Sequence, residues 1–324
     1  MSPLLRQQSV NRKCVSSEKS TEKLLGPTTA LIAVQVLFGS IPVIGKTVLS
    51  VVGPFGVVGF RIGLTALVLV LFQAVRGRVW LRERSDYLKL AVLSLFGLTF
   101  NQLLFIGGLS FTKASNTSLL AVTIPIFTLA VSALIGSEKI TRLKVAGIIS
   151  AALGVILLID PRNASFSSET TIGDLMIVTN SLCFGIYVAT SKEVITRNGA
   201  FRSMMWVFVF AGLICVPLGL VSFSSIDVAA VPTTVWLLLV YLAIFATAAP
   251  YLLNAYAISR VSPIIVAVFI YLQPLIGFVL AVIFLNEVID GRFIIAATLV
   301  FAGVFLTTRK QAQEAGDSNS GVNL

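Results

Sequence analysis

The chain has 324 residues, of which 56% are hydrophobic and only 12% are charged, and its formal net charge is +10. A soluble domain carries about 25% charged residues, so this composition excludes a single aqueous core and predicts a polytopic membrane protein. The positive charge lies in short segments between apolar runs and forms no patch with interleaved aromatic residues, which argues against a nucleic-acid partner.

Ten apolar runs organise the chain between two polar ends. Residues 1–26 are polar and basic, with no apolar core before a cleavage site, and we interpret them as a disordered cytoplasmic tail without a signal peptide. Most runs approach the ~20 residues that a helix needs to cross hydrocarbon, and backbone groups in lipid must be satisfied within their own segment. The predicted helices are 29–49, 54–74, 88–108, 116–136, 143–159, 174–191, 204–222, 234–254, 263–285 and 293–308, followed by a cytoplasmic tail, 309–324.

The lysines and arginines predict the orientation. With the N-terminus inside, 19 of the 24 fall in inner segments and 4 in outer segments, and the remaining one, Arg61, lies within the second run. Cytoplasmic loops carry the excess of Lys and Arg, so both termini are expected to be cytoplasmic. The compact loops favour a multi-pass protein of a cell inner (plasma) membrane.

One stretch occurs twice in the chain. Residues 108–158 align without a gap on 257–307 at a separation of 149 positions, which pairs Ser110 with Ser259, Pro125 with Pro274, Glu138 with Glu287 and Gly154 with Gly303. Five helices per half is an odd number, so the second half must enter the membrane inverted. The predicted fold is therefore all-α, with ten transmembrane helices in two inverted five-helix repeats, 27–160 and 172–308, and a substrate site between them.

Short motifs accompany this repeat and carry a family resemblance. They are Phe38-Gly39, Phe60-Arg61, Phe184-Gly185, and a Pro followed thirteen positions later by Glu in each repeated stretch. Taken in order and duplicated, the set resembles the EamA family of the drug/metabolite transporter superfamily. The resemblance implies a ten-helix exporter or exchanger of small organic solutes, with amino acids and their derivatives as the leading class. Phe38 stands where family members often have Trp, which is expected to alter the pocket wall.

Polar and small residues within the apolar helices are the candidate substrate-binding groups. An intramembrane charge such as Arg61 is costly and suggests function; its partner would be backbone carbonyls or an anionic solute group, with snorkelling as the alternative. Close packing and interhelical hydrogen bonding are the alternatives for the other residues. We expect the following set to converge on a mixed pocket for an amphipathic metabolite: Gln35, Gly39, Arg61, Asn101, Asn180, Tyr187, Tyr251 and Gln273.

Two prolines and two glutamates stand at matching positions of the repeats. Pro125 and Pro274 each remove a backbone hydrogen bond and should kink the fourth and ninth helices, as hinges for a rocking motion or as static bends. For Glu138 and Glu287 a structural role at a helix end is favoured over proton carrying. Since no acidic residue lies near the centre of a run, we expect a facilitator, an exchanger, or a carrier coupled through these edge carboxylates.

These features predict a secondary transporter that works by alternating access, and a lipid flippase or scramblase-like carrier is the alternative. A membrane enzyme would need a base or a metal cluster, whereas the chain has no histidine and its cysteines (Cys14, Cys183 and Cys215) have no paired spacing. We therefore expect no catalytic residue, no metal and no cofactor. The expected partners are the bilayer and an uncharged, zwitterionic or singly anionic solute, and the chain is a monomer or a homodimer.

Overall fold

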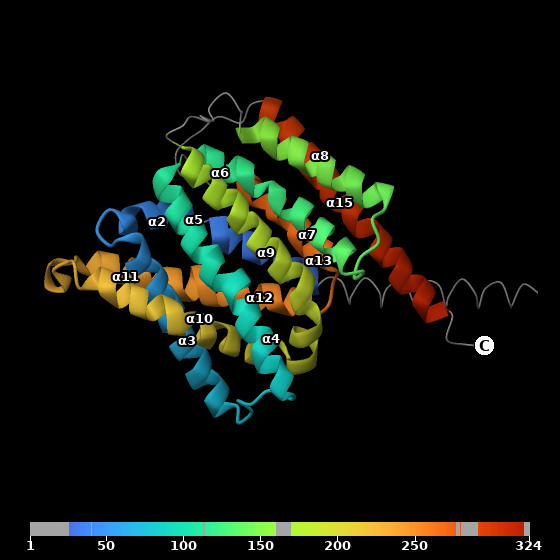
Figure 1. The fold of residues 1–324 in the computed structure, drawn as a ribbon. Coiled ribbons are helices and arrows are strands. Elements are labelled where there is room, and N and C mark those ends of the chain that lie inside the picture. The colour runs from blue at the N-terminus through green and yellow to red at the C-terminus, as the bar shows by residue number, and fades with distance from the viewer. Residues whose placement is uncertain are drawn as a thin grey trace, which may run out of the picture.

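The computed structural model describes residues 26–39, 41–112, 114–159, 170–276, 279 and 291–320, and within them it contains helices and no strand (Figure 1). Five helices are long and apolar enough to cross a membrane: α3 (Pro54–Val75), Arg84–Phe111, α9 (Thr171–Asn198), α10 (Ala200–Phe223) and Thr233–Ile258. Four apolar helices are shorter: Gly26–Gly39, Thr123–Leu134, Pro263–Ile276 and Phe293–Thr308. The all-helical membrane fold is confirmed, while the number of ten spans stays a prediction.

Two predicted runs are interrupted near a proline. The fourth divides into α6 (Ala114–Ala121) and α7 (Thr123–Leu134), and the ninth changes from α13 (Pro263–Val268) to the 3-10 turn η5 (Phe269–Tyr271). A proline lacks an N–H and its ring clashes with the carbonyl four residues earlier, so Pro125 and Pro274 each disturb the regular helix before them. In the first predicted run the structure describes Gly26–Gly39 and α2 (Ile41–Leu49).

Other helices differ in length from the predicted runs. The sixth predicted run, 174–191, extends to Asn198 in α9, where Gly199 ends the helix with a positive φ of 84°. A glycine adopts this left-handed conformation at little cost, so α9 can continue through its polar last turns before it stops. The backbone of α15 (Gly291–Ser320) remains helical through most of the predicted C-terminal tail.

Two long helix pairs pack closely through glycines: α3 with α10, and α8 (Arg142–Ile159) with α15 (Figure 1). A Cβ on Gly59 would lie 2.6 Å from the Cα of Gly219, and a Cβ on Gly147 would lie 2.8 Å from the carbonyl oxygen of Gly303. Small residues allow helix backbones to approach in a membrane, where water supplies no hydrophobic force between helices.

Two π-helical segments occupy equivalent positions of the two halves. The segment η1 (Leu95–Thr99) joins α4 (Arg84–Ser94) to α5 (Phe100–Phe111), and η4 (Ile244–Ala248) joins α11 (Thr233–Ala243) to α12 (Ala249–Ile258). They are 149 positions apart, the same separation as the sequence repeat. A π turn shifts the helical hydrogen bonds by one residue and often occurs at functional sites.

The central helix α9 is fastened to the first half of the chain at both ends. At its start, Asp174 accepts hydrogen bonds from the side chains of Thr112 (2.6 Å) and Asn116 (3.0 Å). At its end, the fully buried Asp86 accepts hydrogen bonds from Asn198 Nδ2 (2.7 Å) and Arg197 Nε (3.1 Å). These carboxylates anchor α9 where it leaves the apolar region.

The turn between α7 and α8 contains an ion pair. The side chain of Glu138 is only 5% exposed, and its Oε2 accepts a hydrogen bond from Lys144 Nζ. The other carboxylate oxygen, Oε1, has no hydrogen-bond partner within the described part of the chain. Glu138 therefore stabilises this turn, as the sequence favoured, whereas Glu287 lies outside the described residues.

Candidate functional site

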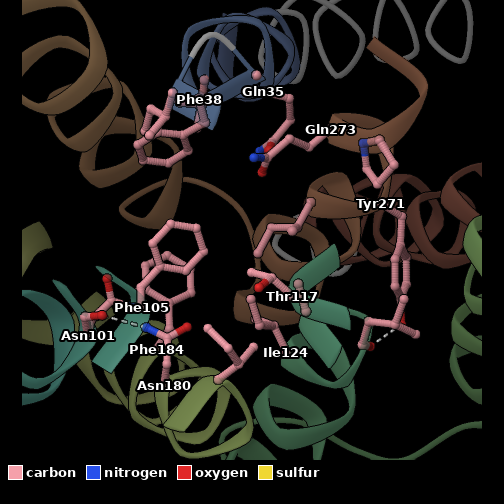
Figure 2. Close-up of a pocket in the computed structure, with 18 of the residues that line it drawn as sticks. Gln35, Phe38, Asn101, Phe105, Thr117, Ile124, Asn180, Phe184, Tyr271 and Gln273 are labelled. Carbon is pink, nitrogen blue, oxygen red and sulfur yellow. Dashed lines mark hydrogen bonds between the residues drawn. The ribbon is translucent and has the colours of Figure 1, made fainter. Parts of the chain in front are cut away.

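A cavity of about 420 Å³ lies between helices from both halves of the chain. The first half contributes Gly26–Gly39, α2, α3, α5, α6, α7 and α8, and the second half contributes α9, α12 and Pro263–Ile276. Figure 2 shows Gln35 and Phe38 on one side of the open space and Asn101 and Phe184 across from them. The walls are mostly apolar with a few polar groups, which is the usual make-up of a small-molecule site.

Seven of the eight predicted binding residues line this cavity, namely Gln35, Gly39, Arg61, Asn101, Asn180, Tyr251 and Gln273. The eighth, Tyr187, is not among the lining residues and is only 1% exposed. Its ring packs on Gly97, where an added Cβ would lie 2.6 Å from Tyr187 Cγ, and its hydroxyl contacts Met204 Sδ at 3.6 Å. Tyr187 lies two helical turns after Asn180 on α9. At that level the neighbouring helices pack directly against α9, so Tyr187 is covered and does not reach the cavity.

The two predicted hinge residues have different surroundings. Pro274 lines the cavity, whereas Pro125 is buried in α7 and is not part of the wall. The two broken helices touch beside the cavity, because Tyr271 Oη donates a hydrogen bond of 2.9 Å to the carbonyl of Val122. The interruptions at Val122 and at η5 are thus in direct contact.

Aromatic rings form much of the apolar wall. Phe38 meets Tyr251 edge to face, with ring centroids 6.0 Å apart, and Tyr251 meets Phe208 in the same way at 5.5 Å. Phe105 and Phe184 also line the cavity. Such rings offer broad apolar contact to the hydrocarbon part of a solute and hold Tyr251 in one orientation.

A hydrogen-bond network joins the polar residues on α5, α9 and α12. Gln102 Nε2 donates to Tyr251 Oη at 3.0 Å and to Asn101 Oδ1 at 3.2 Å. Tyr251 Oη lies 3.2 Å from the carbonyl oxygen of Gly97, to which it donates, and Asn180 Nδ2 donates to the carbonyl of Asn101 at 2.6 Å. These groups largely satisfy one another's hydrogen-bonding capacity. This agrees with the alternative stated for such residues, that they form hydrogen bonds between helices.

Gln102 is a lining residue that the sequence interpretation did not select. It lies beside Asn101, so a search for one polar face of the helix passes over it. The repeat contained a signal, because Gln102 and Tyr251 are 149 positions apart and therefore equivalent. Thr117, Asn254 and Tyr271 are further lining residues outside the predicted set.

Arg61 is the charged residue of the described cavity lining, and it is buried, with 2% of its surface exposed. Its Nε donates to Thr247 Oγ1 at 2.9 Å and its Nη2 to the carbonyl of Ala246 at 3.1 Å, both in η4. One turn later on α3, Thr65 Oγ1 donates to the carbonyl of Ala243 at 2.9 Å. The end of α11 and the π segment η4 thus each present a carbonyl to α3, and Arg61 is buried among them rather than extended toward the membrane surface.

No ion pair compensates the charge of Arg61 among the described residues. The ion pairs there join Lys89, Lys144 or Arg197 to Glu83, Asp86, Glu138 or Glu193. The guanidinium of Arg61 instead contacts two neutral groups of η4, the Thr247 hydroxyl and the Ala246 carbonyl. The wall of the cavity therefore has a positive charge that no described side chain neutralises.

The amides of Gln35 and Gln273 point toward one another into the cavity, from Gly26–Gly39 and Pro263–Ile276 (Figure 2). Gln35 is 2% exposed, and its Oε1 accepts no hydrogen bond within the described part of the chain. An unsatisfied buried acceptor is costly, so this oxygen is a candidate contact for a donor that enters the cavity.

The fold and this cavity define a multi-pass helical membrane protein with a solute-sized site between the two halves of its chain. The model of the EamA-like transporter family matches residues 26–160 and 171–309. The chain belongs to this family and is a membrane transporter, which confirms the resemblance found in the sequence motifs.

Proteins named as transporters match this chain over most of both sequences. An uncharacterized transporter of Archaeoglobus fulgidus is 29% identical over 83% of this chain and 92% of its own. A probable terminal-alkyne amino-acid exporter of Streptantibioticus cattleyicolor is 24% identical over 79% of this chain and 85% of its own. A solved crystal structure matches with a TM-score of 0.71 and 19% identity, covering 89% of this chain and 98% of the other, which shows the shared fold.

Proposed function

We propose that this chain is a secondary transporter that moves a small organic metabolite through the central cavity by alternating access between two inverted halves. The observation that carries this proposal is the cavity itself, whose wall combines aromatic rings with polar groups from helices of both halves. Transporters built from inverted repeats bind their solute at the interface between the repeats. The exporter from Streptantibioticus cattleyicolor supports amino acids or their derivatives as the solute class and export as the direction.

The proposed topology has ten spans, with both termini in the cytoplasm of a cell inner membrane. In that orientation Leu109 and Leu158 lie near the outer ends of their helices, and both line the cavity. The Asp86–Arg197 contact would close the inner ends of α4 and α9. In the proposed cycle the halves rock about the interruptions before Pro125 and Pro274.

The proposed carrier is a facilitator or an exchanger. No carboxylate is found among the cavity-lining residues that the structure describes, and Glu138 is engaged by Lys144. Proton-coupled carriers usually bury an ionisable group on the solute path. Transport rates in proteoliposomes should therefore be the same with and without a pH gradient. A stimulation of about tenfold that disappears in Glu138→Gln would instead identify a carrier coupled through this carboxylate.

Growth of overexpressing cells against a panel of toxic amino acids and analogues tests the function. The blocking variant is Gly39→Phe, because Gly39 lines the cavity and the nearest described atom to an added Cβ is Ile276 Cγ2, at 3.6 Å. The matched control is Gly212→Phe on α10, outside the cavity lining, where an added Cβ meets only Val216, at 3.9 Å. We expect resistance to one chemical class, which Gly39→Phe abolishes and Gly212→Phe retains.

Transport of labelled lipid in proteoliposomes tests the alternative of a flippase or scramblase-like carrier. The proposed solute carrier moves lipid no faster than protein-free vesicles. Lipid movement that Gly39→Phe blocks, together with an absence of resistance to any solute, would replace the solute carrier by the lipid carrier.

A further inference from the structure

The guanidinium of Arg61 has hydrogen-bonding capacity that the protein leaves unused. A guanidinium has five N–H donors, and Arg61 uses Nε toward Thr247 and Nη2 toward Ala246. Within the described part of the chain, Nη1 donates no hydrogen bond to any group. Because Arg61 lines the cavity, this unused edge is available to a solute.

The charge of Arg61 selects the kind of group that can bind there. A buried charge requires a partner of opposite sign, and the described lining holds neither a carboxylate nor a second cation. One arginine neutralises one negative charge, so a dianionic phosphate would bring in uncompensated charge. A carboxylate matches both the charge and the planar N–H geometry of a guanidinium.

A second unused group lies on Gly26–Gly39, another helix that lines the cavity. Gln35 Oε1 is buried and accepts no hydrogen bond within the described residues, whereas Asn101, Asn180 and Tyr251 are largely satisfied by one another. An amide oxygen accepts hydrogen bonds and repels a bare anion. Its natural complement on a solute is an ammonium or a hydroxyl.

We infer that the cavity binds a monocarboxylate that also carries an amine or hydroxyl and an apolar tail. The carboxylate binds Arg61, the amine or hydroxyl donates to Gln35 Oε1, and the tail packs on Phe38, Phe105 and Phe184. This inference rests on the proposed transport function and assigns the substrate class of the same cavity. Arg61 then serves as the anion site, and Gln35 discriminates among carboxylates.

Four probes of one size separate the two contacts. L-phenylalanine has a carboxylate and an amine, 3-phenylpropionate has only the carboxylate, L-phenylalaninamide has only the amine, and 3-phenylpropanamide has neither. Each is measured as a competitor and as a labelled solute in proteoliposomes of the full chain, and by thermal stabilisation of the purified protein. We expect the wild type to prefer L-phenylalanine to 3-phenylpropionate and to discriminate by about 10- to 100-fold against both probes without a carboxylate.

Variants assign each preference to one residue. Arg61→Gln should lose the carboxylate preference and retain the amine preference, and Gln35→Leu should do the reverse. Arg61→Lys keeps the charge and should retain part of the carboxylate preference, which provides a test if Arg61→Gln does not fold. Thr65→Val is the matched control, since it removes a side-chain bond from α3 to the carbonyl of Ala243, at the end of α11, and lies outside the cavity lining.

Three outcomes would overturn the inference. The first is a wild type that carries 3-phenylpropanamide as well as L-phenylalanine, and the second is a Thr65→Val variant that loses the carboxylate preference as completely as Arg61→Gln. The third is a wild type that neither binds nor carries any of the four probes. In the first two cases transport is present and the proposed function stands. In the third, resistance in the growth assay decides whether the proposed function stands without this substrate class.

Discussion

Gln102 and Tyr251 are equivalent residues of the two halves, 149 positions apart, and they bind one another: Gln102 Nε2 donates to Tyr251 Oη at 3.0 Å. The same separation recurs where Tyr271 donates to the carbonyl of Val122, and where Ser150 Oγ donates to the carbonyl of Leu299, each at 2.9 Å. Equivalent residues of two related halves meet only beside the axis that relates them. We infer that this axis passes along the cavity wall, where two of these contacts lie.

The contact between Gln102 and Tyr251 should be measurable as a coupling energy. Gln102→Leu and Tyr251→Phe each remove it, and we expect each to lower the free energy of unfolding by about 1 kcal/mol. A double-mutant cycle should give a coupling of about 0.6 kcal/mol, the average for such bonds in membranes. The measurement is unfolding of the detergent-solubilised protein. Fully additive effects would show that the two side chains do not interact in solution.

Asp86 should be among the most sensitive polar residues outside the cavity. It is fully buried and accepts hydrogen bonds from Arg197 and Asn198, so Asp86→Ala leaves both donors without their partner. Breaking a buried pair in this way costs about 3 kcal/mol or more. Lys89→Ala is the control, because its ion pair with Glu193 is exposed and should change stability by less than about 0.5 kcal/mol. Equal thermal shifts of the two variants would contradict this role of Asp86.

The crossing of α3 and α10 should not tolerate a side chain at Gly59. An added Cβ would lie 2.6 Å from both the carbonyl oxygen of Cys215 and the Cα of Gly219, which are backbone atoms that cannot rotate away. We expect Gly59→Ala to cost about 1–3 kcal/mol and Gly59→Leu to prevent a monodisperse peak in size-exclusion chromatography. Gly212→Ala on α10 is the matched control, because an added Cβ there makes an ordinary van der Waals contact with Val216, at 3.9 Å. A monodisperse Gly59→Leu protein with wild-type stability would show that these helices cross differently.

Replacing Pro125 tests whether the interruption in the fourth predicted helix serves the transport cycle. Pro125→Ala restores an N–H without altering the cavity wall, and we expect stability to rise by about 1 kcal/mol while turnover falls several-fold. Pro217→Ala, inside α10 and outside the cavity lining, is the control and should leave turnover unchanged. Counterflow in proteoliposomes gives the rate. If Pro125→Ala retains wild-type turnover, the interruption is a static bend and does not act in the transport cycle.

The sequence alone determined the class of fold and most of the polar residues of the cavity wall. Insertion in a membrane depends on the apolar composition of each local segment, which the sequence gives directly. The internal repeat separately identified Pro125 and Pro274 as an equivalent pair. Helical periodicity put Gln35 and Gly39 on one face and directed polar residues inward, away from lipid. Seven of eight selected residues line the cavity for that reason.

Only the tertiary structure decided which inward-facing residues meet the cavity and which partners they have. Tyr187 and Gln102 show this, because the depth at which helices converge depends on the packing of several helices, and Tyr187 fell below the cavity while Gln102 lines it. The surroundings of Arg61 came from a π turn, a one-residue shift in hydrogen bonding with no compositional signature. Periodicity gives the direction of a side chain, whereas burial, pairing and unused donors depend on contacts between distant segments.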